Sequence, residues 1–158
     1  MVEAIFGAPY DYATASKLIV KANLDWLCDP HAGNVPEQFM REGAPSVLRM
    51  IEDCSPDMIL PMEKIYFRVL KAVMQEAGFT VTDCPVNKFY VRLNSKNAAQ
   101  NLWCFRAESP QGKSFVVIKL PQSPARMYQA DLAARCGQAV RKAAQQIAAG
   151  QAVDVTLL

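Results

Sequence analysis

The segment from Ser114 to Ala149 limits the fold more than any other part of this sequence. Its apolar run, Phe115-Val116-Val117-Ile118, shows no alternation of polar and apolar residues, which predicts a strand covered on both faces, inside a layered sheet. A loop bracketed by prolines follows, with Ser123 as the expected N-cap of a long helix and Pro124 at its first position. Gly150 is expected to end this helix after Ala149.

The stretch from Met58 to Gly78 has the same plan of apolar strand, proline and amphipathic helix. The repeated passage from strand to helix predicts an α/β fold of three layers, with a mixed or mostly parallel sheet and helices on both faces. The expected order over one domain, residues 1–158, is β-β-α-β-α-β-β-β-α. The predicted strands are Val2–Phe6, Lys17–Leu27, Met58–Leu60, Phe79–Val91, Leu102–Ala107 and Phe115–Leu120, and the predicted helices are Glu37–Asp53, split near Pro45, Met62–Ala77 and Ser123–Ala149.

Composition excludes several classes of protein. No run approaches the length of about 20 apolar residues that a membrane-spanning helix needs, so no membrane partner is expected. The N-terminus lacks the basic and apolar regions of a secretory signal. The five cysteines are odd in number and form no CxxC pair, which favours free thiols and a cytoplasmic location. A net charge of +2 for the whole chain is too small to indicate nucleic acid by itself.

Candidate catalytic and metal-binding residues are few. Cys28 and His31 have the spacing of half a metal site, but no second Cys or His pair completes four ligands. His31 is the only histidine, and neither a GxGxxG nor a P-loop motif is present. We therefore expect no metal, no cofactor and no assembled catalytic group, and the sequence leans away from an enzyme.

Basic residues gather on the predicted last helix, where they alternate with glutamines. Arg126 follows the helix N-terminus, whose free N–H groups already favour an anion. This polar face is a candidate for contact with phosphate. Its basic residues are Arg126, Arg135, Arg141 and Lys142, and its glutamines are Gln129, Gln138, Gln145 and Gln146.

The loop Leu120-Pro-Gln-Ser-Pro-Ala-Arg-Met-Tyr128, between a buried strand and a helix, resembles the His-Pro-Ser-Pro loop of the uracil-DNA glycosylase superfamily. Ala22-Asn23-Leu24 is similar to the strand whose asparagine reads the extruded base, and Gly7-Ala-Pro-Tyr10 to the water-activating loop. The resemblance implies DNA as partner, with Ser123 and Arg126 on phosphate and with Asn23 and Gln122 facing the base.

Two departures from this family bear on activity. Gln122 stands where the family has its catalytic histidine, and an amide cannot become an imidazolium that stabilises a leaving uracil anion. Ala8 stands where a carboxylate precedes the proline. The resemblance therefore implies a nucleic-acid-binding domain without glycosylase activity; if the chain were an enzyme, a glycosylase-like hydrolase would be expected.

Two other functions stay open from the sequence. Residues 62–150 have the α-β-β-β-α order of double-stranded RNA-binding domains, although their last helix begins with one basic residue instead of a lysine pair. Alternatively, seven methionines could form an adaptable apolar surface, as in a non-catalytic adaptor that binds another protein or a second copy of itself.

Overall fold

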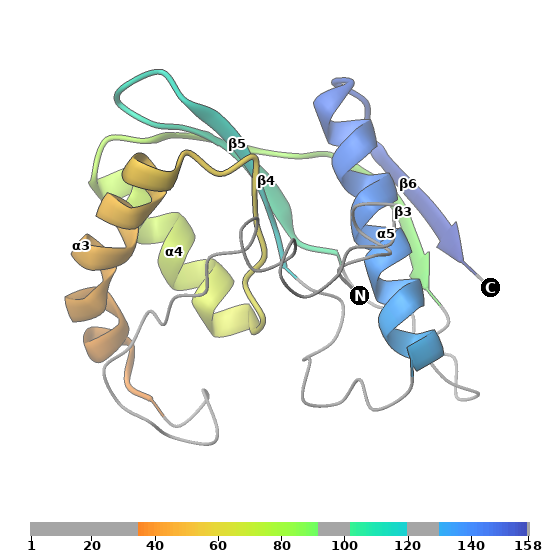
Figure 1. Ribbon diagram of the computed structural model, residues 1–158, viewed down its shortest axis with the longest axis horizontal. Coiled ribbons are helices and arrows are strands. Elements are labelled where there is room, and N and C mark those ends of the chain that lie inside the picture. Colours follow the sequence, from red (N-terminus) through yellow and green to blue (C-terminus); the bar gives the residue numbers. More distant parts are fainter. Residues whose placement is uncertain (1–34, 92–101, 120–129, 158) are drawn as a thin grey trace. The chain divides into compact units, whose positions relative to one another are not determined.

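The computed structural model describes residues 35–91, 102–119 and 130–157 (Figure 1). The chain divides into two compact units, each built from separate stretches of sequence. Residues 1–20, 84–103 and 120–158 form the first, here called the two-stranded unit, and residues 21–83 and 104–119 form the four-stranded unit. Whether the two units behave as the single domain expected over residues 1–158 stays a prediction.

The four-stranded unit is a mixed sheet with two helices. The strands lie in the order β1-β5-β4-β2, with β1 parallel to β5 and the other two pairings antiparallel. The predicted α/β class and mixed sheet are confirmed, and β5 is an interior strand as its apolar run predicted. The elements are α3 (Glu37–Cys54), β1 (Met58–Ile59), α4 (Lys64–Glu76), β2 (Thr80–Asp83), β4 (Cys104–Glu108) and β5 (Ser114–Ile118).

One face of this sheet forms the core of the unit. Phe105 and Val117 are register partners on β4 and β5, so their side chains lie on the same face, and both are fully buried. Phe67 of α4 packs edge-on against Phe105, with ring centroids 5.1 Å apart. On the opposite face, Arg106 and Glu108 are exposed in the described structure. Helices on both faces of the sheet were expected, but on β4 the charged residues Arg106 and Glu108 occupy the face opposite to Phe105.

Helix α3 differs from the prediction, because it continues through Pro45 instead of splitting there. Gly43 and Ala44 are buried, whereas Pro45 is exposed. Proline removes one N–H of the helical ladder. Helix α3 packs on α4, and small buried residues such as Gly43 and Ala44 are suited to a close approach of two helices. This packing offsets the lost hydrogen bond.

Helix α4 ends where the sequence predicted, at Gly78, which has a φ of 84°. The N–H of Phe79 donates to the carbonyl of Met74 at 2.9 Å, and the N–H of Gly78 donates to that of Gln75 at 3.1 Å. These two bonds form the Schellman cap, which needs a left-handed residue and therefore favours glycine.

The two-stranded unit consists of β3 (Val86–Val91), α5 (Ala130–Ala148) and β6 (Val153–Leu157). Strands β3 and β6 are parallel, and β6 was not predicted. Helix α5 packs against this sheet. The helix ends at Gly150 as expected, with a φ of 72° and the same pair of cap bonds as at Gly78. Its buried residues include Cys136, Ala139, Val140, Ala143 and Ile147.

The strand predicted across Phe79–Val91 is two strands that belong to different sheets. Strand β2 pairs with β4, whereas β3 pairs with β6. Pro85 lies between them and has no N–H to continue a ladder. Its carbonyl instead accepts a hydrogen bond of 2.8 Å from Val153, the first residue of β6. The break therefore sits where the second sheet begins.

Candidate nucleic-acid interface

The four residues predicted to bind nucleic acid lie outside the described residues. Asn23 belongs to the first 34 residues, and Gln122, Ser123 and Arg126 belong to the segment 120–129. The predicted N-cap and first turn of the last helix fall in the same segment. Their roles stay predictions, and the candidate interface is built from the elements that flank them.

The ends of the two-stranded unit can be assigned from its topology. Helix α5 runs opposite to β6, because Gln146, near the end of the helix, hydrogen-bonds to Asp154, near the start of the strand. Since β3 and β6 are parallel, the first turn of α5 lies at the end where both strands finish (Figure 1). Ligands of α/β folds bind at this carboxyl end of parallel strands.

Two stretches of sequence connect to that end of the unit. The chain leaves β3 into residues 92–101 and enters α5 from residues 120–129. Together these stretches contain three cations, Arg92, Lys96 and Arg126, and no Asp or Glu. The sequence that follows β3 and the sequence that precedes α5 are therefore basic.

The exposed face of α5 carries four polar residues that we call the α5 stripe: Gln138, Arg141, Lys142 and Gln145. They are spaced three, four and seven positions apart, which places them on one side of a helix. No ion pair joins Arg141 or Lys142 to a carboxylate within the described ranges. Their charges are therefore available to a ligand.

Two other polar residues of α5 have structural roles. Arg135 pairs with Asp131 one turn earlier, at 3.0 Å. The side-chain amide of Gln146 donates to the carbonyl of Asp154 and accepts from its N–H, both at 3.0 Å, so it binds the backbone of β6. The sequence placed Arg135 and Gln146 on the same polar face as the four residues of the α5 stripe. The structure distinguishes them, because Arg135 and Gln146 bind other groups of the unit.

Charge is divided unequally between the two units. The sequence grouped in the two-stranded unit has eight Lys and Arg against four Asp and Glu, or +4. The four-stranded unit has nine against eleven, or −2, and the two values add up to the +2 of the whole chain. Sequence reasoning missed this division because it treated charge as one total.

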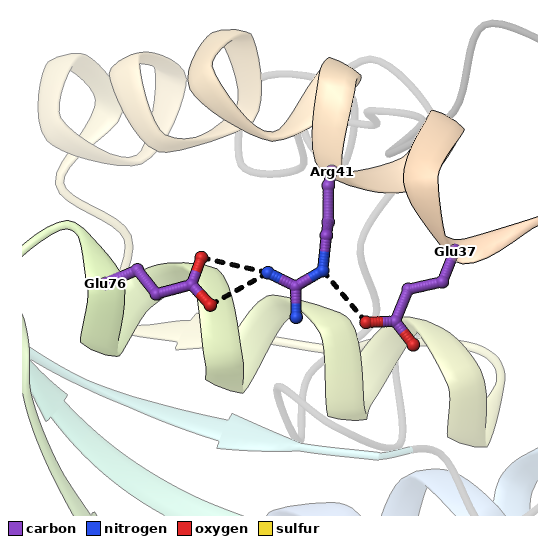
Figure 2. Close-up of polar contacts among 3 residues, drawn as sticks. All are labelled: Glu37, Arg41 and Glu76. Carbon is purple, nitrogen blue, oxygen red and sulfur yellow. Dashed lines mark hydrogen bonds and ion pairs between the residues drawn. The ribbon is translucent and has the colours of Figure 1, made fainter.

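In the four-stranded unit, several charged side chains join one element of the fold to another. Figure 2 shows Arg41 of α3 between two carboxylates: it donates to Glu37 at 2.9 Å, and to both oxygens of Glu76 on α4 at 2.8 and 2.9 Å. The hydrogen bonds with Glu76, and then those with Glu37, raise the pKa of Arg41 above its ordinary value. The pair with Glu76 joins α3 to α4, whereas the pair with Glu37 lies within α3. Because both carboxylates face one guanidinium, they do not resemble an acid–base pair.

Other cations of this unit are also engaged. Lys71 of α4 pairs with Asp83 of β2 at 2.6 Å. The ammonium of Lys113 donates to the carbonyl of Glu52 at 2.8 Å and to the hydroxyl of Ser55, at the C-terminus of α3. Helix α3 has no basic residue in its own last turn, so Lys113 supplies the cation that a helix C-terminus favours.

Within the described residues, no group of three or more His, Cys, Asp or Glu side chains could hold a metal ion. Four cysteines of these ranges form no disulfide, and Cys104 and Cys136 among them are buried. Cys28 and His31 lie outside the described residues. No helix in the described ranges has the length and apolar character to cross a bilayer.

No protein-family model, no curated protein and no solved structure matches this chain. Its function must therefore be inferred from its own residues.

Proposed function

We propose that this protein binds nucleic acid, with DNA as the first candidate, through the two-stranded unit, and that it does not excise bases. The observation that carries the proposal is the division of charge: +4 on this unit against −2 on the other. Phosphates attract a basic surface, and the attraction supplies most of the sequence-independent affinity for nucleic acid. A chain of low net charge can bind a polyanion when its cations are gathered in one part.

In the proposed interface, the loop 120–129 supplies most of the residues that contact nucleic acid. It enters α5 at the carboxyl end of β3 and β6 and resembles a loop that presses into DNA. In the proposed interface, Ser123 and Arg126 contact phosphate, while Asn23 and Gln122 face a base. Phosphate contacts position a protein on nucleic acid, and contacts with base edges add sequence preference.

The absence of base excision is proposed from the residue types alone. Gln122 replaces the histidine of the resembled loop, and Ala8 replaces the carboxylate of the water-activating loop. Neither an amide nor a methyl group can transfer a proton to or from a reacting group. The described cysteines form no disulfide, and Cys54 is exposed; this supports a reducing compartment, and we place the protein in the cytoplasm.

The other two functions have less support. Strands β2, β4 and β5 of the predicted RNA-binding module share one sheet, but β3 and the last helix, α5, belong to the other unit. Helix α4 packs on β2 and helix α5 packs on β6, so the two helices do not cover the same sheet. Exposed large apolar residues in the described ranges are Met62 and Val86, one in each unit. Within those ranges, no apolar patch built from several residues favours an adaptor.

Fluorescence anisotropy with labelled duplex DNA, single-stranded DNA and duplex RNA tests the proposal. We expect binding at low salt that weakens steeply as salt rises, and Arg126→Ala should lower the slope of log affinity against log salt by about one. Absence of binding to all three probes at low salt would refute the proposal. Release of uracil from uracil-containing DNA would refute its non-catalytic part.

A further inference from the structure

The α5 stripe lacks the partners that surface cations of a helix commonly have. A helix often places a carboxylate one turn away from a Lys or Arg. The pair Asp131–Arg135 follows this pattern at the start of α5. Around Arg141 and Lys142, the positions one turn away on either side hold no acid: they are Gly137, Gln138, Gln145 and Gln146.

Stabilisation of α5 itself does not explain the two cations. A Lys or Arg favours the negative end of a helix only within its last turn. Arg141 and Lys142 lie well before the end of α5 at Ala148, and the last turn contains no basic residue. Both side chains are exposed, so they do not serve the packing of the helix on β3 and β6 either.

The chemistry of the stripe fits phosphate. From Gln138 to Gln145 it extends about 10 Å, since an α-helix rises about 1.5 Å per residue. One strand of a duplex presents a phosphate roughly every 3.4 Å of helix axis, so the stripe covers the length of about three phosphates. Two cations provide charge and two side-chain amides provide hydrogen-bond donors, which also bind phosphate and sugar oxygens.

The same stripe does not fit a lipid surface. Helices that lie on membranes insert large apolar side chains beside their basic residues. The exposed apolar residues near the stripe are Ala148 of α5 and Ala149, which follows the helix, and the large apolar residues Val140 and Ile147 are buried in the unit. Nucleic acid is therefore the polyanion that the stripe matches.

We infer that the α5 stripe is a second phosphate-binding surface, which contacts the sugar–phosphate backbone of one strand regardless of base sequence. The inference rests on the proposed function and extends it, since the stripe lies on the body of α5 and is separate from the loop 120–129. The two sites would act together: the loop end reaches a base, and Arg141 and Lys142 hold the backbone along the helix.

The decisive comparison uses two double variants of the full chain. Arg141→Ala/Lys142→Ala removes two exposed cations from α5, and Arg49→Ala/Arg68→Ala removes two exposed helical cations from α3 and α4 in the four-stranded unit. Both pairs lower the net charge by the same amount. Circular dichroism and thermal unfolding should show that both variants fold like the wild type, because all four side chains are exposed.

We expect the α5 variant to bind duplex DNA roughly tenfold or more weakly at about 0.1 M salt, with a salt slope lower by about two. The control variant should stay within about twofold of wild type, because its residues lie outside the basic unit. The loss should be equal for DNA probes of unrelated sequence. Arg141→Lys should restore most of the affinity lost in Arg141→Ala, since a lysine still offers a cation to phosphate.

The outcomes separate this inference from the proposed function. If the wild type binds DNA and the two double variants lose affinity equally, the α5 stripe is not a phosphate site, while nucleic-acid binding stands. If the wild type binds no nucleic acid, the proposed function fails and the inference fails with it. Binding to phosphatidylserine vesicles without binding to nucleic acid would overturn both in favour of a membrane surface.

Discussion

The two units use their charged side chains in different ways. In the four-stranded unit, Arg41, Lys71 and Lys113 each join elements of the fold, through Glu76, through Asp83 and through the C-terminus of α3. In the two-stranded unit, the described ion pair is local, between Asp131 and Arg135 within α5. These three cations of the first unit connect elements of the fold, whereas Arg141 and Lys142 of the second are exposed and lack a described carboxylate.

This difference explains why the total charge of the chain is a poor guide to its partner. A net charge of +2 is the sum of a basic unit and an acidic unit. Each unit gathers stretches that are far apart in the sequence, so no single window of sequence shows the division. The comparison predicts that changes to the core and to the paired side chains of the four-stranded unit affect stability, and that changes on the α5 stripe affect binding.

The largest effect is expected in the four-stranded core. Phe105→Ala removes a fully buried ring that packs against Phe67 and should lower the free energy of unfolding by about 3–5 kcal/mol. Urea denaturation measures the loss. Hydrogen exchange then shows how far it spreads: if the chain is one cooperative domain, amides of β3 and β6 lose protection together with those of β4 and β5. Unchanged protection of β3 and β6 would contradict the single-domain prediction.

Replacing the glycine that caps a helix should lower the free energy of unfolding by the same amount in both units. Gly78→Ala and Gly150→Ala each force a Cβ into left-handed backbone, at about 1–2 kcal/mol. The new methyl group would meet only Pro110 at 3.9 Å in the first case, and nothing within 4 Å in the second, so the cost is conformational. Thermal unfolding compares the two variants. Asparagine, which tolerates this conformation, should cost less at either site, and a much larger loss at Gly78 would contradict the equal cost.

A smaller effect is expected for Gln146, the polar residue of α5 that serves the fold. Gln146→Ala removes two hydrogen bonds to the backbone of Asp154 and should cost about 1 kcal/mol. The amide of Asp154 should exchange faster in the variant. Gln145→Ala is the matched control, because Gln145 is exposed on the α5 stripe and should leave stability unchanged. Equal losses in both variants would remove the distinction between structural and exposed glutamines.

The smallest effect is expected for the ion pairs of Arg41. Glu76→Gln should lower the thermal midpoint only slightly and less at high salt, because the group is exposed. Since Glu76 and Glu37 raise the pKa of Arg41, its contribution is complete below the unfolded-state pKa and is lost only as pH rises through the higher folded pKa. The difference between variant and wild type should therefore be constant from neutral to moderately alkaline pH. A difference that fades in that range would contradict the role of the guanidinium.

Local sequence predicted much of the fold. The helix ending at Gly78, the helix ending at Gly150 and the interior position of β5 are all confirmed. These features depend on residues close together in the chain: helical spacing of apolar residues, glycine where left-handed backbone is needed, and an apolar run without alternation. The continuous α3 was missed, because the cost of Pro45 was judged without the packing of α3 on α4.

The candidate site was predicted less completely. The sequence identified Arg141 and Lys142 on a polar helical face, but it could not separate them from Gln146, which binds β6. Strand β6 itself was missed, so its partner could not be recognised. Asn23, Gln122, Ser123 and Arg126 remain predictions, since they lie outside the described residues.

Across the described ranges, the sequence by itself determined where the helices and most strands form, because hydrophobic periodicity, proline and glycine act over a few residues. The tertiary structure alone decided which strands share a sheet. The chain leaves one sheet at Pro85 and joins β6, about 70 residues later, because strand pairing is chosen by long-range contacts. That choice also placed the exposed Arg141 and Lys142 of α5 in one unit and the paired Arg41 and Lys71 in the other.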